Sequence, residues 1–261
     1  MTRQGRLAVL TNFREEGAIK PGPRSRGLLP NLHLTRSIQD GQGTEDFVSS
    51  LIERDGLQGI GGFSLVCGQV GEPIAVISNR TPNVKDITWI TKTRGETVGL
   101  SNANIADRSW TKVTRGETLV QDVIHQSVSA KGSKESLVEA LFDVLSDDAL
   151  PRDTDGKSWE SRVRELRKSI FIPAVGGRAT KKESAEDLAA AKEDDHTSLN
   201  KPHQQDPKQL GMSGTYGTQK QTIVLVSHGG HVTFIERSLY GNEPLDNSET
   251  QDRVFEFDIG S

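Results

Sequence analysis

The sequence predicts an α+β protein, and three observations support this prediction. The chain has 261 residues, which is enough for one large domain or two small ones. Apolar runs of strand length occur near both ends of the chain, whereas apolar residues at helical spacing dominate from about residue 112 to residue 145. Strands followed by helices and then by strands are typical of sheets that face helices, and not of a parallel, doubly wound sheet.

The N-terminal part begins with a predicted strand and a predicted loop. Residues 7–11 read LAVLT and are almost entirely apolar, so we expect a buried strand. Residues 17–43 carry many Gly, Pro and Ser residues and predict a long surface loop. A helix is then expected from Thr44, its predicted cap, to Gly56, with a core face made of Phe47, Val48, Leu51 and Ile52.

A meander of short strands is predicted next. The stretches GGFSLVCGQ (61–69) and PIAVISNR (73–80) are apolar strands, joined by VGE in a predicted hairpin. DITWITKT (86–93) continues the meander, and VGLSNA (98–103) is predicted as a further short strand.

Apolar spacing predicts two helices after the meander. The first runs from about Lys112 to Ser129, and the second begins after Ser133. Gly116 is expected to weaken the first turns of the first helix. Residues 158–173 form a third amphipathic stretch. The expected inward residues of the two helices are Val113, Leu119, Val120, Val123, Ile124, Leu137, Leu141, Val144 and Leu145.

The C-terminal part divides into a polar tract and a group of strands. Residues 174–212 contain no aromatic residue and are rich in charged and amide side chains, so they bury too little apolar area to offset their ordering entropy. We therefore expect a disordered insertion. Residues 222–237 predict a hairpin that turns at Gly229 and Gly230, and residues 253–259 predict a last strand.

The composition excludes several classes of protein. The net charge of −4 leaves no basic excess to neutralise phosphates, so no nucleic-acid binding is expected. No apolar run approaches membrane-spanning length and no signal-peptide core follows MTRQGR, so neither a transmembrane segment nor Sec export is expected. Cys67 is the single cysteine, which excludes an intramolecular disulfide and suits a reducing compartment.

Polar clusters at predicted strand ends are the main candidates for chemistry. They are Asn12 to Arg14, Ser78-Asn79-Arg80, Ser101-Asn102 and Tyr216-Gly217-Thr218. A side-chain or backbone N–H at such a place could stabilise an oxyanion. The alternative is that Asn simply ends strands, because its side chain favours turns. Both interpretations stay open.

Other candidates are less specific. His228 and His231 flank a Gly-Gly turn, but two histidines do not complete a zinc site, so no metal is predicted. Cys67 lies in an apolar strand, where a small buried thiol is usually inert. A loose basic group, which could meet an anion or form a solvated surface, consists of Lys92, Arg94, Lys112 and Arg115.

Several motifs together resemble one family. The chain contains, in order, GRLAVLTNFRE, SRGLL, GGFSLVCG, ISNR, GLSNA followed by SWTKVTRGE, SIFIP, and YGTQKQTIVLVSHGGHVTFIERS, and it closes with FEF. In order and spacing these motifs resemble the Transport and Golgi organisation protein 2 family, also called the NRDE family. The resemblance runs from Arg6 to Pro173 and resumes at Gly214, so residues 174–212 fall outside it.

The resemblance implies a fold and a cellular role. The fold would be an αββα sandwich like that of the N-terminal-nucleophile hydrolases. Residues 1–173 would form the first part of the domain, 174–212 the disordered insertion, and 213–261 the C-terminal strands. The role would be in Golgi organisation, secretion, and lipid or haem homeostasis, in the cytoplasm with associations to Golgi, endoplasmic reticulum or mitochondria. Haem as a transported ligand, or a lipid or acyl-CoA, would be the bound molecule.

The resemblance also implies site residues. In the hydrolase superfamily an N-terminal Cys, Ser or Thr attacks an amide, and Asn side chains with backbone N–H groups hold the oxyanion. Asn12, Asn79 and Asn102 match such positions, and Asn102 in GLSNA matches best. No catalytic residue is assigned. The full set of ligand-pocket candidates is Asn12, Arg14, Asn79, Arg80, Asn102, Tyr216 and Thr218.

The sequence departs from the family pattern at its start. Family members carry a Cys directly after the initiator Met and then an Asn-Arg-Asp-Glu motif, and neither is present here. We therefore expect an N-terminally shortened, non-enzymatic member that lacks its first strands; the alternative is an amidohydrolase of the N-terminal-nucleophile type. Thr2 could become N-terminal, but its amine is not expected to reach the site. Gln219 stands where the family usually has Arg. The strands expected to have unpaired edges are Leu7–Leu10, Phe63–Val66 and Ile223–Val226.

Overall fold

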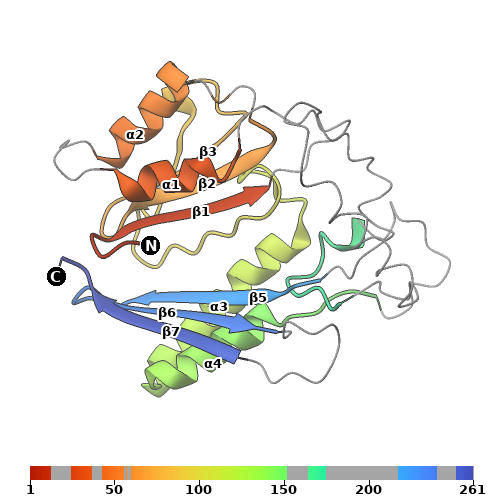
Figure 1. Ribbon diagram of the computed structural model, residues 1–261. Helices are drawn as coiled ribbons and strands as arrows, with labels where there is room; N and C mark the ends of the chain where they lie inside the picture. Colours follow the sequence, from red (N-terminus) through yellow and green to blue (C-terminus); the bar gives the residue numbers. More distant parts are fainter. Residues whose placement is uncertain are drawn as a thin grey trace, which may run out of the picture. The chain divides into compact units, whose positions relative to one another are not determined.

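The computed structural model describes residues 1–12, 25–36, 43–55, 57, 60–151, 164–174, 217–239 and 251–260. The chain divides into two compact units. The first comprises Met1–Val144, Thr222–Glu236 and Asp252–Ser261, and the second comprises Leu145–Gln221 and Arg237–Gln251. The described elements are helices and antiparallel strands (Figure 1), which confirms the predicted α+β class at this level.

A four-stranded sheet carries the N-terminal core. Its strands are β1 (Arg6–Asn12), β2 (Phe63–Gln69), β3 (Ile74–Ser78) and β4 (Thr88–Ile90), in the order β1-β2-β3-β4. All neighbouring pairs are antiparallel, which confirms the predicted meander. The predicted turn between β2 and β3 is closed by the Glu72 N–H, which donates to the Gln69 carbonyl at 3.1 Å. Gly71 takes a φ of 90° there, which favours glycine.

The C-terminal strands form a second sheet of three strands. They are β5 (Lys220–Val226), β6 (His231–Ser238) and β7 (Gln251–Asp258), in the order β5-β6-β7. The predicted hairpin between β5 and β6 is confirmed. Its turn is closed by the Gly230 N–H, which donates to the Ser227 carbonyl at 3.0 Å, and Gly230 has a φ of 83°.

The expectation about unpaired edges is confirmed for two strands and wrong for the third. Among the described strands, β1 and β5 lie at the edges of their sheets, as expected. β2, which contains Phe63–Val66, lies between β1 and β3, and its residues Phe63 and Leu65 are 0% exposed. β1 is also less buried than its apolar sequence predicts. Ala8 and Leu10 pack on the core, whereas Val9 points to the other face and is 48% exposed.

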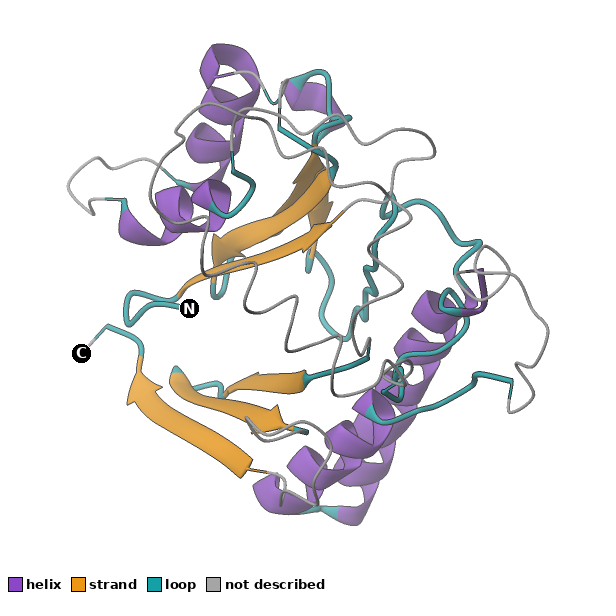
Figure 2. Cartoon of the chain, turned by 45° about the vertical axis from the view of Figure 1, so that its right-hand side comes forward, coloured by secondary structure: helices purple, strands orange, loops and turns teal. Residues whose placement is uncertain are grey.

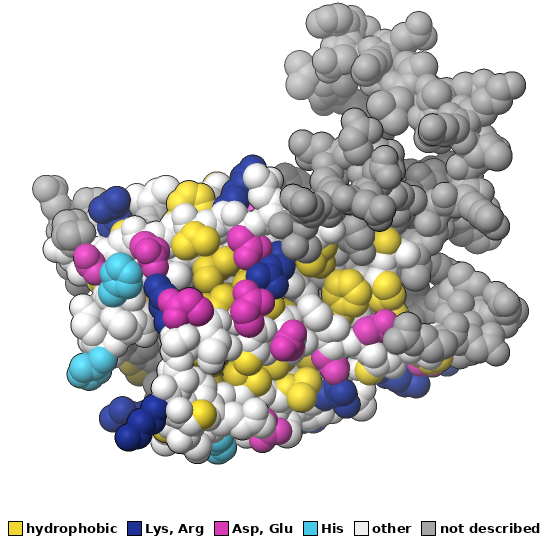
Figure 3. Space-filling view, turned by 90° about the horizontal axis from the view of Figure 1, so that it is seen from below, with side chains coloured by type: hydrophobic (Ala, Val, Ile, Leu, Met, Phe, Trp, Pro, Cys, Tyr) yellow, Lys and Arg dark blue, Asp and Glu magenta, His cyan; other side chains and the backbone are white. Residues whose placement is uncertain are grey.

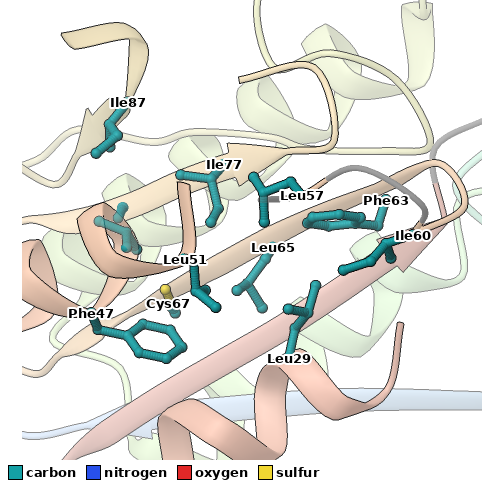
Figure 4. Packing of buried hydrophobic residues seen from close by; sticks show 12 residues of the cluster. Leu29, Phe47, Leu51, Leu57, Ile60, Phe63, Leu65, Cys67, Ile77 and Ile87 are labelled. Atoms are coloured by element: carbon teal, nitrogen blue, oxygen red, sulfur yellow. The ribbon is translucent and has the colours of Figure 1, made fainter. Parts of the chain in front are cut away.

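Two helices pack on one face of the four-stranded sheet. Helix α1 (Leu28–Thr35) contacts β1 and β2, and helix α2 (Thr44–Ser50) contacts β2 and β3 (Figure 2). Side chains from both helices and from alternate strand positions meet in one cluster (Figure 4). Its members are Leu29, Phe47, Val48, Leu51, Leu57, Ile60, Phe63, Leu65, Cys67, Ala75, Ile77 and Ile87.

Helix α1 corrects the predicted surface loop over residues 17–43, of which residues 17–24 and 37–42 lie outside the described part. Its sequence, LLPNLHLT, places Leu29 and His33 four residues apart, and both are buried. Pro30 is compatible with the helix because it lies in the first turn, where a backbone N–H has no intrahelical partner. Composition alone misled the prediction, because flanking Gly and Pro residues obscured this short apolar pattern.

Helix α2 begins as predicted but is capped differently. Gly43, not Thr44, is the cap residue, and its N–H donates to Asp46 Oδ2 at 3.1 Å. Thr44 instead lies at the first helical position and is buried. The helix was expected to continue to Gly56, but residues Leu51–Asp55 form a π-helical turn, η2. Gly56 itself lies outside the described residues.

The two long predicted helices are confirmed, although their buried faces differ in part. They are α3 (Thr111–Ala130), which continues through Gly116, and α4 (Lys134–Leu145). On α3, Val113 is buried, but Ile124 is 41% exposed, contrary to expectation. The buried residues of α4 are Val138, Phe142 and Val144. A one-turn 3-10 helix, η3 (Val84–Asp86), precedes β4.

The second unit shows less of the predicted structure. Of the amphipathic stretch 158–173, residues 164–168 form a single turn, closed by the Lys168 N–H on the Glu165 carbonyl at 2.9 Å. Ser169 is fully buried beyond it, and its Oγ accepts from the Ala149 N–H at 2.9 Å. The predicted insertion from residue 175 onward lies outside the described residues, so the disorder expected there stays a prediction.

Candidate functional site

Two of the predicted asparagines lie at the same end of the four-stranded sheet. Asn12 is the last residue of β1 and pairs with Phe63, the first residue of β2. Asn79 directly follows β3, whose last residue, Ser78, pairs with Ser64. Because neighbouring strands are antiparallel, the ends of β1 and β3 meet at the start of β2. A hydrogen bond from the Phe63 N–H to Asn79 Oδ1, at 3.4 Å, joins them.

The third asparagine reaches this end from a distant part of the chain. Asn102 Nδ2 donates to the Asn12 carbonyl at 2.8 Å, and Thr11 Oγ1 donates to the Ser101 carbonyl at 3.3 Å. The GLSNA segment therefore lies against the last two residues of β1. We call Asn12, Asn79 and Asn102 the asparagine cluster.

The segment that carries Asn102 is not the predicted strand. Residues 98–103 have no ladder partner among the described strands, and side chains hold the segment instead. Glu117 on α3 accepts from the Gly99 N–H at 2.8 Å and from Arg108 Nη1 at 2.9 Å. A Cβ on Gly99 would lie 3.0 Å from Val113 Cγ1, so the segment packs closely on α3. Side-chain anchoring, which strand propensity does not report, decided this local structure.

Glu117 is the electrostatic anchor of that segment. The hydrogen bond from Arg108 lowers the pKa of the Glu117 carboxyl, and the Gly99 N–H acts in the same direction, while partial burial opposes both. The carboxylate is therefore stabilised as the charged acceptor that both donors need. No pattern in the sequence singled out Glu117, because its partners lie 9 and 18 residues away.

The asparagine cluster presents one amide and uses the other two for positioning. Asn102 donates its amide to the backbone of β1, and Asn79 accepts from the backbone of β2. The Asn12 side chain is exposed and makes no hydrogen bond with any described residue. It therefore offers both an N–H donor and a carbonyl acceptor to a ligand. This arrangement can bind a carbonyl, carboxylate or phosphate oxygen.

The sequence also predicted four further pocket residues, Arg14, Arg80, Tyr216 and Thr218. Arg80 follows Asn79 and is exposed, and its N–H donates to Ser78 Oγ at 3.1 Å. Arg14 and Tyr216 lie outside the described residues. Thr218 belongs to the second unit, where its Oγ1 accepts from the Ile172 N–H at 3.0 Å. Within that unit the Thr218 hydroxyl is thus part of a backbone contact.

Thr2 lies at the opposite end of β1 from the asparagine cluster. Its Oγ1 accepts from the Arg6 N–H at 3.2 Å, and Arg6 pairs with Gln69 at the far end of β2. The six residue steps from Arg6 to Asn12 span about 20 Å at a strand rise of about 3.3 Å. An amine at Thr2 therefore does not reach the cluster.

The cysteine is buried, and the described residues show no metal-binding cluster around the histidines. Cys67 is 0% exposed, and burial raises the pKa of its thiol to about 12, so the thiol stays protonated at neutral pH. His231 Nδ1 lies 2.8 Å from Asp258 Oδ1 on β7. Within the described ranges, no group of three or more His, Cys, Asp and Glu side chains is arranged to hold a metal ion.

His33 is a buried polar residue that the sequence did not reveal. It is 2% exposed, its Nε2 lies 3.2 Å from the Gly68 carbonyl, and its ring centroid lies 5.0 Å from that of Phe47. Burial lowers the pKa of His33, and the charges of Arg6 and Arg36 add to this effect, while the Gly68 contact opposes it. The sequence signal was the leucine pattern of LLPNLHLT, which indicates a helix with Leu29 and His33 on the same face.

Comparison with known families gives one match. The model of the family described as Transport and Golgi organisation 2 matches residues 1–241. No curated protein matches the chain significantly. Among the described helices, none is long and apolar enough to cross a membrane.

Proposed function

The chain belongs to the Transport and Golgi organisation 2 family, and from this premise we propose that it binds haem or a lipid such as an acyl-CoA without transforming it. In this role it would contribute to Golgi organisation and secretion and to lipid or haem homeostasis, in the cytoplasm or on Golgi, endoplasmic reticulum or mitochondria. The proposed fold is the αββα sandwich of the N-terminal-nucleophile hydrolases, interrupted by a disordered insertion at residues 174–212.

The observation that carries the proposal is the asparagine cluster. An exposed Asn12 amide stands at the end of β1, and Asn102 and Asn79 fix the backbone on either side of it. Haem propionates, acyl thioesters and the phosphates of coenzyme A all present oxygen acceptors to such an amide. A fixed donor at a sheet end supports oriented binding of one of these groups.

A non-enzymatic role is supported by the groups near the cluster. Amide hydrolysis of the N-terminal-nucleophile type needs a free amine beside a Cys, Ser or Thr. Thr2 is at the far end of β1, and the Cys67 thiol is buried and protonated. The amidohydrolase alternative is favoured only by the capacity of the cluster to hold an oxyanion.

Ligand titrations with two asparagine variants test the proposal. We expect Asn12→Ala to weaken binding of haem or palmitoyl-CoA about 5- to 30-fold, the effect of losing about 1–2 kcal/mol, with an unchanged melting temperature. Asn102→Ala should weaken binding more than it lowers stability. The matched control is Asn104→Ala, two residues further along the loop, where Asn104 Oδ1 only accepts from the Ala106 N–H at 2.9 Å.

The outcomes separate the hypotheses. Unchanged affinity for both ligands in Asn12→Ala and Asn102→Ala would remove the cluster from ligand binding. Hydrolysis of simple amides by the chain, abolished by Thr2→Ala, would establish the amidohydrolase instead. Deleting residues 174–212 should leave the melting temperature nearly unchanged, and a large drop would contradict the proposed insertion.

A further inference from the structure

The two outer residues of the GLSNA segment both contact helix α3. At one end of the segment, the Gly99 N–H donates to Glu117 Oε1 at 2.8 Å. At the other end, Ala103 is 8% exposed and belongs to the same small buried cluster as Val113. Asn102 therefore lies between a polar contact and an apolar contact with the first turns of α3.

Gly99 fits against α3 because it has no side chain. A Cβ at this position would lie 3.0 Å from Val113 Cγ1 and 3.2 Å from both Glu117 Cγ and the Val113 carbonyl oxygen. The carbonyl belongs to the helix backbone, which does not turn aside as the end of a flexible side chain does. The hydrogen bond to Glu117 thus holds the segment at the closest distance that the helix surface allows.

Arg108 fixes the direction in which Glu117 accepts. Its Nη1 donates to Glu117 Oε1 at 2.9 Å, and its Nη2 donates to Oε2. The Glu117 side chain is only 14% exposed, whereas that of Arg108 is 50% exposed. Because a two-pronged contact with a guanidinium constrains both carboxylate oxygens, Oε1 stays aimed at the Gly99 N–H.

The inner residues of the segment meet the end of β1. Thr11 Oγ1 donates to the Ser101 carbonyl at 3.3 Å, and Asn102 Nδ2 donates to the Asn12 carbonyl at 2.8 Å. The exposed Asn12 amide is the proposed ligand donor, so the residue that carries it is held by Asn102. One continuous set of contacts therefore connects the carboxylate on α3 to the ligand site at the end of β1.

We propose that Glu117 is a positioning residue of the asparagine cluster, which sets ligand affinity by holding Gly99, and with it Asn102, against the end of β1. This inference rests on the proposed function, because it concerns the same ligand site. Without the charged acceptor, the segment leaves the arrangement in which Asn102 reaches Asn12. The apparent affinity then falls with the fraction of molecules that keep the binding-competent arrangement.

Glu117→Gln tests the charge with little change in size. Gln keeps one side-chain oxygen but turns an NH₂ group toward Arg108. We expect the affinity for haem and for palmitoyl-CoA to fall about 3- to 10-fold, as for the loss of one hydrogen bond that holds the competent arrangement. The loss should not exceed that of Asn102→Ala, because Glu117 acts through Asn102.

Two further variants bracket this result. Gly99→Ala leaves both charges in place, but its methyl group pushes the segment away from α3, so it should weaken binding to a similar extent. The matched control is Glu96→Gln. Glu96 Oε2 also accepts from a backbone N–H, that of Lys92 at 3.1 Å, but this contact lies outside the segment. Its loss should leave the affinity unchanged.

A double-variant cycle separates positioning from general stability. In the Asn102→Ala background, Glu117→Gln should change the affinity no further, since the side chain that it positions is gone. In the ligand-free protein, the NMR signals of the Asn102 side-chain amide should move in Glu117→Gln and stay in place in Glu96→Gln. Unmoved Asn102 signals in Glu117→Gln, or an undiminished effect of this variant in the Asn102→Ala background, would overturn the proposal.

Failure of this inference and failure of the proposed function give different results. If Asn102→Ala weakens binding and Glu117→Gln does not, only the positioning role is wrong. If the wild type binds neither probe, or if Asn12→Ala and Asn102→Ala both bind as the wild type does, the proposed function is wrong and Glu117 has no ligand to position.

Discussion

Strand β2 of the first sheet and strand β7 of the second sheet are buried to very different degrees. In the four-stranded sheet, β2 lies between β1 and β3, and its residues Phe63, Leu65 and Cys67 are 0% exposed. In the three-stranded sheet, nearly every residue of β7 is exposed, and Val254 and Phe255 are each 56% exposed. Figure 3 shows a face on which hydrophobic side chains are interspersed with acidic and basic ones.

The contacts around these two strands differ in kind as well. The cluster around β2 is apolar, whereas β7 is tied to its neighbours by polar groups, with Lys134 and Thr233 on Glu256 and His231 on Asp258. Apolar burial stabilises by removing area from water, whereas exposed ion pairs contribute little. We therefore expect stability to depend on β2 far more than on β7.

The largest effect is expected from one substitution made in both sheets. Phe63→Ala should lower the free energy of unfolding by about 3–5 kcal/mol, because it leaves a cavity in a fully buried site. Phe255→Ala should lower it by about 1 kcal/mol, since that ring is half exposed and mainly loses its contact with Phe234. Urea denaturation of both variants measures the difference, and equal losses would contradict the comparison.

A polar contact should matter where it satisfies a backbone group. Glu117→Ala leaves the Gly99 N–H without its acceptor and releases Arg108, so we expect a loss of about 1–3 kcal/mol. The control is Asp122→Ala on the exposed side of the same helix, which should change little. If Glu117→Ala behaved like Asp122→Ala, the anchoring of residues 98–103 would have another cause.

The pH dependence of stability should report on His33, the buried histidine of helix α1. The folded-state pKa of His33 is lowered from 6.5, so its neutral form is stabilising above pH 6.5, and that stability is lost as the pH falls through the folded pKa. Between pH 7 and pH 5 the free energy of unfolding should fall more steeply in the wild type than in His33→Gln. A slope in His33→Gln as steep as that of the wild type would contradict this prediction.

The smallest effect is expected at the ion pair of the second sheet. Lys134 and Glu256 are both about half exposed, so solvent screens their attraction. Glu256→Gln should leave the melting temperature within experimental scatter at 0.15 M salt. A marked drop in the melting temperature at every salt concentration would contradict this expectation. It would show that the polar contacts of β7 contribute substantially to stability.

Much of the fold was predictable because its signals are local. The apolar runs of β2 and β3, the Gly-Gly hairpin and the spacing of α3 each occupy a short window of sequence. Local windows failed at α1, where flanking Gly and Pro residues hid a helix, and at residues 98–103, where a strand-like composition takes no ladder partner among the described strands. Burial also departed from pattern, since β1 lies at an edge and Ile124 faces solvent.

The sequence by itself determined that Asn12, Asn79 and Asn102 would follow apolar runs, because that much is written in neighbouring residues. Only the tertiary structure decided that they meet. The Asn102 amide donates to the Asn12 carbonyl across 90 residues of chain, and Asn79 accepts from the first residue of β2. Periodicity reports which face of an element is apolar, whereas the distance between two polar groups depends on how the whole chain packs.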